Sequence, residues 1–177
     1  MYPDCDEILK MAPDYDIIPV CREIYADVIT PITLLRKLAA VSKRYYLLES
    51  VEGGEKWGRY SFLGFDPVMR VKCSCGKVTI EKDGEETEKV TDKPLEVLRE
   101  ILKDYKAPRL AGLPPFAGGF VGYFAYAMIG YAEPKLKIKK GTFNDYDMML
   151  FDKVIAYDHL KQKISIIVNM KTDKVME

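Results

Sequence analysis

The stretch MMLFDKVIAYDHLKQKISIIVNM, residues 148–170, decides the fold. Two strongly apolar runs, Met148–Tyr157 and Lys163–Met170, flank a polar segment, Asp158–Gln162. Apolar runs rich in β-branched and aromatic residues predict strands, and the short polar connection predicts that the two form a hairpin. The end of the chain is therefore expected to lie in a sheet built from hairpins.

More strands are expected upstream of this hairpin. Ile17–Tyr25 is rich in β-branched and aromatic residues, and Tyr45–Ser50 and Tyr60–Phe65 are short apolar runs on either side of a turn at Glu52–Glu55. The paired glycines in that turn supply backbone angles that other residues rarely adopt. Further alternating runs over 71–80, followed by Asp83-Gly84, predict a β-meander.

Only two substantial helices are expected. Thr30 is a suitable N-cap, Pro31 suits the first helical position, and apolar residues then recur at helical spacing up to Val41. The second helix opens at Pro94, with an apolar stripe of Leu95, Leu98, Leu102 and Tyr105. Two helices among seven or more strands predict an α+β fold with antiparallel sheets.

Composition narrows the classes of function. The 177 residues suffice for one sizeable domain, and 27 basic side chains balance 27 acidic ones. This balance argues against a nucleic-acid partner, which usually requires a basic excess. No apolar run approaches the roughly 18 residues that span a membrane, and the acidic start lacks a signal-peptide pattern. We therefore expect a cytoplasmic protein without a membrane partner.

The catalytic and metal-binding inventory is small. The chain has one histidine, His159, which is expected to be solvated at the tip of a hairpin, so no His-based triad or metal cluster is predicted. Cys73 and Cys75 are expected to share one face of a strand as small apolar side chains. The glycine-rich run Gly118–Gly122 superficially resembles a phosphate loop, but a strand with closely approaching backbone is the better interpretation.

One polar cluster stands out around the turn at Glu52–Glu55. Its candidate residues are Leu48, Glu49, Ser50, Arg59, Tyr60 and Ser61. Glu49 suits an ammonium group, Arg59 suits a carboxylate, and Ser50 both donates and accepts hydrogen bonds. Such a set could hold a zwitterion. On composition alone, a solvated turn with charged rims is the simpler interpretation.

Four blocks of this sequence, in order, resemble the N-terminal region of the anthranilate synthase component I family. They are IPVCREIYADVITPITLLRKL (18–38), LLESVEGGEKWGRYSFLGFDP (47–67), PPFAGGFVGYFAY (114–126) and MMLFDKVIAYDHLKQKI (148–164). The resemblance covers essentially the whole chain, 1–177. It implies antiparallel sheets packed across one another. One departure is Ala127, where the family usually has aspartate after the tyrosine.

The resemblance also implies a function. The family converts chorismate and ammonia to anthranilate and pyruvate with magnesium, and a glutamine amidotransferase subunit, component II, supplies the ammonia. The chorismate and magnesium residues belong to a C-terminal domain of about twice this length, so no catalytic or metal-binding residue and no cofactor is expected in this chain.

The resemblance implies a regulatory role for this chain. In the family, L-tryptophan binds in a pocket partly built from the LLES strand. Glu49 and Ser50 match that motif, Leu48 would line the indole side, and Arg59, Tyr60 and Ser61 match the next block. The C-terminal domain would supply the other wall. The alternatives are the N-terminal region of aminodeoxychorismate synthase component I, a stand-alone amino-acid-binding module, or a cluster that binds nothing.

Overall fold

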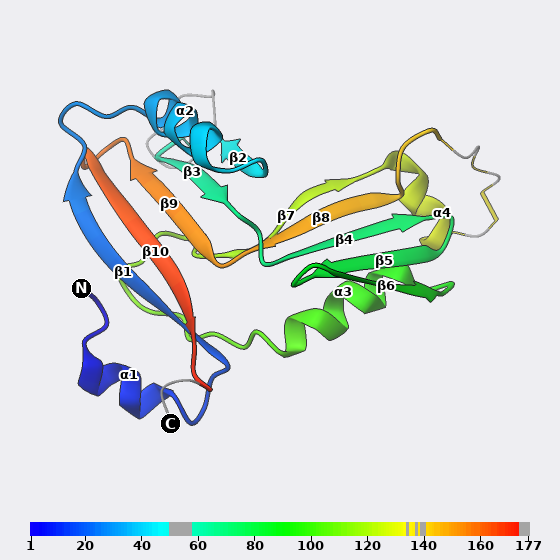
Figure 1. Cartoon of the computed structure of the whole chain (residues 1–177), viewed down its shortest axis with the longest axis horizontal. Coiled ribbons are helices and arrows are strands. Elements are labelled where there is room, and N and C mark those ends of the chain that lie inside the picture. The colour runs from blue at the N-terminus through cyan, green and yellow to red at the C-terminus, as the bar shows by residue number, and fades with distance from the viewer. Residues whose placement is uncertain (50–57, 134, 137, 139–140, 174–177) are drawn as a thin grey trace. The chain divides into compact units, whose positions relative to one another are not determined.

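A computed structural model describes residues 1–49, 58–133, 135–136, 138 and 141–173. Those residues form two five-stranded sheets and a few helices, which confirms the α+β class and the antiparallel pairing (Figure 1). The chain divides into two compact units. One comprises 1–67, 105–119 and 151–177, and the other comprises 68–104 and 120–150. The predicted residue Ser50 and the turn at Glu52–Glu55 lie outside the described residues.

The first unit contains a sheet with the order β1-β10-β9-β3-β2. Its strands are β1 (Ile17–Tyr25), β10 (Lys163–Lys171), β9 (Lys153–Asp158), β3 (Tyr60–Phe65) and β2 (Tyr45–Leu48). All four neighbouring pairs are antiparallel. The register places Tyr60 opposite Asp158 and Leu48 opposite Phe62. The ends of β2, β3 and β9 therefore meet at one place, and these ends carry the polar cluster.

Helices and loops pack against parts of both faces of this first sheet. Helix α2 (Pro31–Val41) begins as predicted, since the Thr30 hydroxyl accepts a hydrogen bond from the Thr33 amide at 3.2 Å. Its Leu34 packs against a buried cluster of Ala26, Tyr157 and Ile164. Two further buried clusters among the described residues are Cys21, Val154 and Ile167, against which Phe116 packs, and Ile8 of helix α1 (Cys5–Met11) with Ala12 and Ile18.

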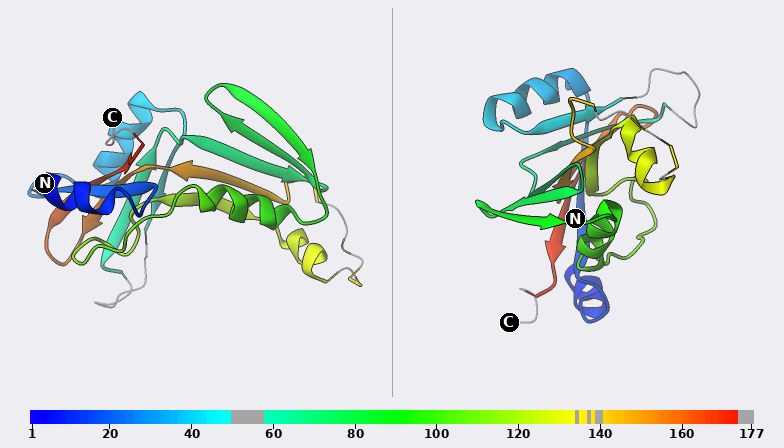
Figure 2. Two further views of the ribbon diagram at one scale, coloured as in Figure 1. Left: turned by 90° about the horizontal axis from the view of Figure 1, so that it is seen from below. Right: turned by 90° about the vertical axis from the view of Figure 1, so that its right-hand side faces the viewer.

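The second unit contains a sheet with the order β6-β5-β4-β8-β7. Its strands are β6 (Glu85–Val90), β5 (Lys77–Lys82), β4 (Met69–Ser74), β8 (Tyr146–Phe151) and β7 (Gly119–Phe124). Helix α3 (Pro94–Lys103) lies along one face of this sheet (Figure 2), where the Tyr146 hydroxyl donates to the Pro94 carbonyl at 3.1 Å. Two short helices, η1 (Tyr126–Met128) and α4 (Ile129–Ala132), follow β7.

The glycine-rich run is a strand, as the sequence indicated. A Cβ atom on Gly122 would lie only 2.0 Å from the Asp147 carbonyl oxygen, so any side chain there would collide with the backbone of β8. This close approach explains the glycine at 122 without a bound phosphate.

Three expectations about individual elements are wrong. The run Met148–Tyr157 is two strands in different sheets, because the chain leaves β8 at Asp152, whose carbonyl accepts from the Asn169 amide at 2.8 Å. Cys75 does not share a strand face with Cys73, since it lies in a turn at positive φ and is exposed. Helix α3 buries Val97 and Leu98, whereas Leu95 and Leu102 of the predicted stripe are exposed.

Candidate functional site

The structure brings the predicted residues of the β2 end and the β3 start together. Leu48 is the last residue of β2, Glu49 follows it, and Arg59 directly precedes Tyr60 and Ser61, which open β3. The antiparallel pairing of β2 with β3 brings these two segments to the same end of the sheet. Leu48 is about half exposed there, as a residue that lines an open apolar wall would be.

A hydrogen-bonded chain links Glu49, Ser61 and His159. The Ser61 hydroxyl is fully buried, donates to Glu49 Oε1 at 3.1 Å and lies 2.7 Å from His159 Nε2. A hydroxyl has a single hydrogen, so if Ser61 donates to the carboxylate, it must accept from His159. The geometry therefore favours the imidazole form that carries hydrogen on Nε2. Ser61 thus holds the Glu49 carboxylate in a defined direction.

His159 corrects a sequence-based expectation. It was expected to be a solvated residue at a hairpin tip, but its side chain is only partly exposed, with its ring 4.8 Å from the Tyr157 ring. Its backbone amide donates to the Arg59 carbonyl at 2.8 Å. The register of β3 with β9 is the reason. It places Asp158, the residue before His159, opposite Tyr60 at the start of β3.

An ion pair lies beside this chain. Arg59 donates from Nε to Asp158 Oδ1 at 3.1 Å and from Nη2 to Oδ2 at 2.6 Å, and its guanidinium lies 4.9 Å from the centre of the Tyr60 ring. Asp158 is only 5% exposed. Burial alone would raise the pKa of Asp158, but hydrogen bonds from Arg59 and from the Lys161 and Leu160 amides outweigh burial and lower it. The same side-chain hydrogen bond raises the pKa of Arg59.

The charges of this cluster favour a cationic group. Glu49 and Asp158 are acidic, Arg59 is basic, and the Asp158–Arg59 pair is mutually compensated. Among the described residues of the cluster, the Glu49 carboxylate then remains as the excess charge, and a neutral hydroxyl orients it. A carboxylate held in this way is a suitable acceptor for an ammonium group. Whether Arg59 also receives a ligand carboxylate stays a prediction.

Sequence reasoning missed Asp158 and His159 as members of the cluster. Both lie in the block MMLFDKVIAYDHLKQKI, which carried the resemblance, yet no polar role was derived for them. Their signal was an Asp-His pair after a buried strand, and only the pairing of β3 with β9 joins it to Arg59 and Ser61.

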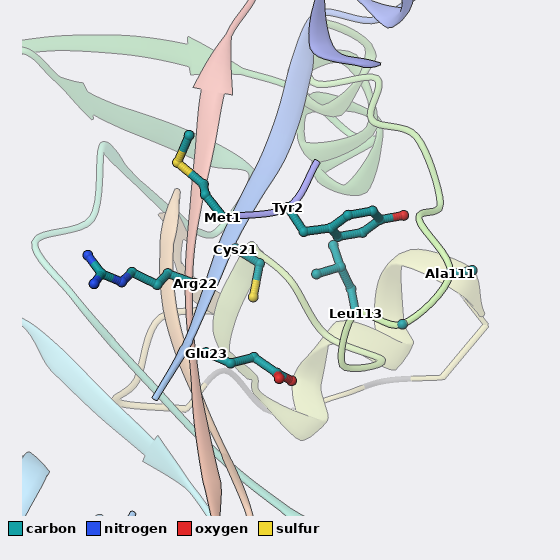
Figure 3. A pocket seen from close by; sticks show the side chains of 8 residues that line it. Met1, Tyr2, Cys21, Arg22, Glu23, Ala111 and Leu113 are labelled. Carbon is teal, nitrogen blue, oxygen red and sulfur yellow. The ribbon is translucent and has the colours of Figure 1, made fainter. Parts of the chain in front are cut away.

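A hollow in the first unit lies elsewhere. It measures about 520 Å³ and is lined by segments at the N-terminus, on β1 and in the loop before β7 (Figure 3), namely Met1, Tyr2, Cys21, Arg22, Glu23, Ala111, Gly112 and Leu113. None of the five predicted residues that the structure describes lines it. Burial raises the pKa of the Cys21 thiol, so this hollow does not contain an activated cysteine.

A second hollow, of about 240 Å³, in the second unit includes Ala127, the residue that departs from the family pattern. In its lining, Asp145 Oδ2 accepts hydrogen bonds from the Tyr131 hydroxyl and the Cys75 amide, both at 2.7 Å. Burial and the bond to Asp145 raise the pKa of Tyr131. Ala127 itself contributes no polar side-chain atom to this hollow. Within the described ranges, no group of three or more His, Cys, Asp or Glu side chains is placed to hold a metal ion.

The molecule defined by these features is an α+β protein with two antiparallel sheets and a polar cluster at the strand ends of the first sheet. No family model matches the sequence. The chain is 44% identical to anthranilate synthase component 1 from Acetivibrio thermocellus, over 99% of this chain and 36% of that protein. It is 40% identical to the protein of that name from Pseudomonas aeruginosa, over 92% of this chain and 34% of the relative.

A solved structure agrees with these sequence relatives. The crystal structure of anthranilate synthase component I from Streptococcus pneumoniae TIGR4 superposes with a TM-score of 0.53 at 27% identity, over 85% of this chain and 32% of that chain. The chain is therefore a homologue of anthranilate synthase component 1, and it spans about a third of the length of the relatives it matches. No helix in the described residues is both long and apolar enough to cross a membrane.

Proposed function

We propose that this chain is the N-terminal region of an anthranilate synthase component 1 and that it contributes part of a feedback site for L-tryptophan. The reaction would join chorismate and ammonia to give anthranilate and pyruvate in tryptophan biosynthesis, in the cytoplasm. The residues that bind chorismate and magnesium would belong to the C-terminal catalytic domain, and a glutamine amidotransferase subunit would supply ammonia. The match to relatives of that name, over 99% and 92% of this chain, supports this assignment.

The observation that carries the regulatory part is the chain from His159 through Ser61 to Glu49. It presents an oriented carboxylate at the end of β2, where the ammonium group of an amino acid would bind. Leu48 is exposed beside it and would contact the indole ring. Arg59 and Tyr60 would form the floor, with the ligand carboxylate near the guanidinium. The catalytic domain would close the other side.

Inhibition then requires a difference in affinity between two arrangements of the enzyme. Tryptophan inhibits only if it prefers the arrangement that binds substrate less well. A coupling free energy of about 1–3 kcal/mol would weaken substrate binding roughly 5- to 150-fold.

The test uses the intact enzyme that contains this chain. Ser50→Phe should fill the pocket and abolish inhibition by L-tryptophan, while turnover of chorismate with ammonia stays near that of the wild type. Ser74→Phe, a change of the same size on the exposed end of β4, is the matched control and should leave inhibition intact. Loss of turnover and inhibition to the same degree in the Ser50 variant would contradict a regulatory role.

A further inference from the structure

The four outer strands of the two sheets differ in how their free edges are protected. An unprotected edge strand offers unpaired backbone groups to another strand, and proteins usually block it with charges, proline, short length or a covering segment. Strand β6 carries charges at four of its six positions, and β2 is only four residues long. The edge of β1 is covered at its centre, where Tyr2 and Cys21 exchange backbone hydrogen bonds at 2.7 and 2.9 Å.

Strand β7 has none of these protections within the described residues. Its sequence, GFVGYF, contains no charge and no proline, and it ends the order β6-β5-β4-β8-β7 (Figure 1). Its last three positions are exposed. An edge of this composition, left in water, is the type that promotes association.

Exposed aromatic side chains continue from this edge. Among the described residues of the second unit, the exposed aromatics are Tyr123 and Phe124 at the end of β7, Tyr126 just after it, and Phe143 before β8. The Ala125 amide donates to the Asp145 carbonyl at 2.8 Å, so the segments that carry Tyr126 and Phe143 run close together. Tyr126 is 84% exposed and Phe143 is 77% exposed. Such exposure is unusual for aromatic residues on a surface that no partner covers.

We propose that β7 is a docking edge, on which a β-strand from the remaining two thirds of anthranilate synthase component 1 adds to the second sheet. This inference rests on the proposed function. The occupant would pair its backbone with β7 and cover the four aromatic side chains with apolar residues. The length of the relatives supports this occupant, since this chain matches only 36% and 34% of two of them and the rest of each relative must pack somewhere.

The experiment co-expresses this chain, carrying an affinity tag, with the part of the Acetivibrio thermocellus relative that the chain does not match. Recovery of that part with the tagged chain measures docking. Tyr123→Lys places a charge on the docking edge and should reduce recovery about tenfold. Val90→Lys places the same charge on the protected edge strand β6, where Val90 is already exposed, and should leave recovery unchanged. Tyr126→Ser tests the aromatic patch outside the strand and should reduce recovery several-fold.

Each result bears on a different claim. If the wild-type chain recovers the partner and both lysine variants do so equally, β7 is not the docking edge, although the proposed function stands. If the wild-type chain recovers nothing, the docking proposal is overturned, whereas the proposed function stands or falls with its own test of inhibition and turnover in the intact enzyme. If the chain instead forms a dimer that Tyr123→Lys dissociates, the occupant is a second copy and the proposal is overturned. Melting temperatures of all variants within about 3 °C of the wild type exclude misfolding as the cause.

Discussion

Each of the two units contains an Arg–Asp pair, and the pairs differ in what surrounds them. Arg59–Asp158 and Arg70–Asp147 both close at 2.6 Å. Around Arg70, Lys72 binds Glu81 at 2.6 Å and Glu81 also lies 3.8 Å from Arg70, so two positive and two negative charges balance. Around Arg59, Glu49 adds a carboxylate whose one hydrogen-bond partner among the described residues is a hydroxyl. A balanced network stabilises a sheet, whereas an excess charge at a strand end is available to a ligand.

The largest effect on stability is expected in the balanced network. Asp147→Ala removes both hydrogen bonds to Arg70, at 2.8 and 2.6 Å, and leaves the guanidinium partly buried with one distant carboxylate. The free energy of unfolding should fall by about 2 kcal/mol, as expected for lost hydrogen bonds to a charged group. Urea unfolding measures this loss. Binding of L-tryptophan by the intact enzyme should stay unchanged. A change in this binding would contradict the contrast between the two Arg–Asp pairs.

Glu49→Gln should have the opposite profile. It keeps the shape and a hydrogen-bond acceptor for Ser61 but removes the charge, so L-tryptophan affinity should fall about tenfold, which corresponds to about 1.4 kcal/mol. Stability in urea should change little, because the side chain of Glu49 is exposed. Calorimetric titration of the intact enzyme, as the wild type and as the variant, gives the comparison. Equal affinity in both would show that this carboxylate does not receive the ammonium group.

The Arg59–Asp158 pair predicts a specific dependence on pH. The folded pKa of Asp158 lies below its ordinary value, so the pair stabilises the fold above the unfolded pKa of about 3.9 and loses this effect as pH falls through the lower, folded pKa. Asp158→Asn should therefore lower the melting temperature most at pH 7. The difference from the wild type should shrink below about pH 4. A difference that stays constant between pH 7 and pH 3 would argue against ionisation of this carboxyl as the cause.

The smallest effect is expected at an exposed pair. Lys77 and Glu88 lie 2.7 Å apart, but about half of each side chain is in contact with solvent. Glu88→Gln should change the free energy of unfolding by less than about 0.5 kcal/mol, since solvent and salt screen such pairs. The same urea experiment checks it. A loss as large as that of Asp147→Ala would mean that burial does not separate the pairs.

Local sequence patterns predicted most elements but not the partition of the chain. The bounds of β1 and β3 agree with the predicted runs because each has a single apolar pattern between turn residues. For residues 148–157 the same reasoning predicted one strand where the structure has two, because two successive buried strands appear in the sequence as one continuous apolar run. The change of sheet at Asp152 depends on a contact with Asn169, and local pattern contains no information about it.

The candidate site divides in the same way. Leu48, Glu49, Arg59, Tyr60 and Ser61 flank one turn, so their proximity could be inferred from a hairpin between neighbouring runs. Asp158 and His159 join them through pairing across about 98 residues, which required a register between β3 and β9 that no local pattern specifies. The contribution of Ser50 stays a prediction.

The most direct measurement of the central claim follows His159, the single histidine of this chain, in the intact enzyme, where the catalytic domain would complete the site; a His159→Gln variant assigns its signals. The ring signals of His159 in a nuclear magnetic resonance spectrum report on the chain through Ser61 to Glu49. Saturating L-tryptophan should shift these signals in the wild type, and indole-3-propionate, which lacks the ammonium group, should shift them far less. Ring signals that stay in place at saturating L-tryptophan, or that respond equally to both compounds, would contradict an ammonium site at Glu49.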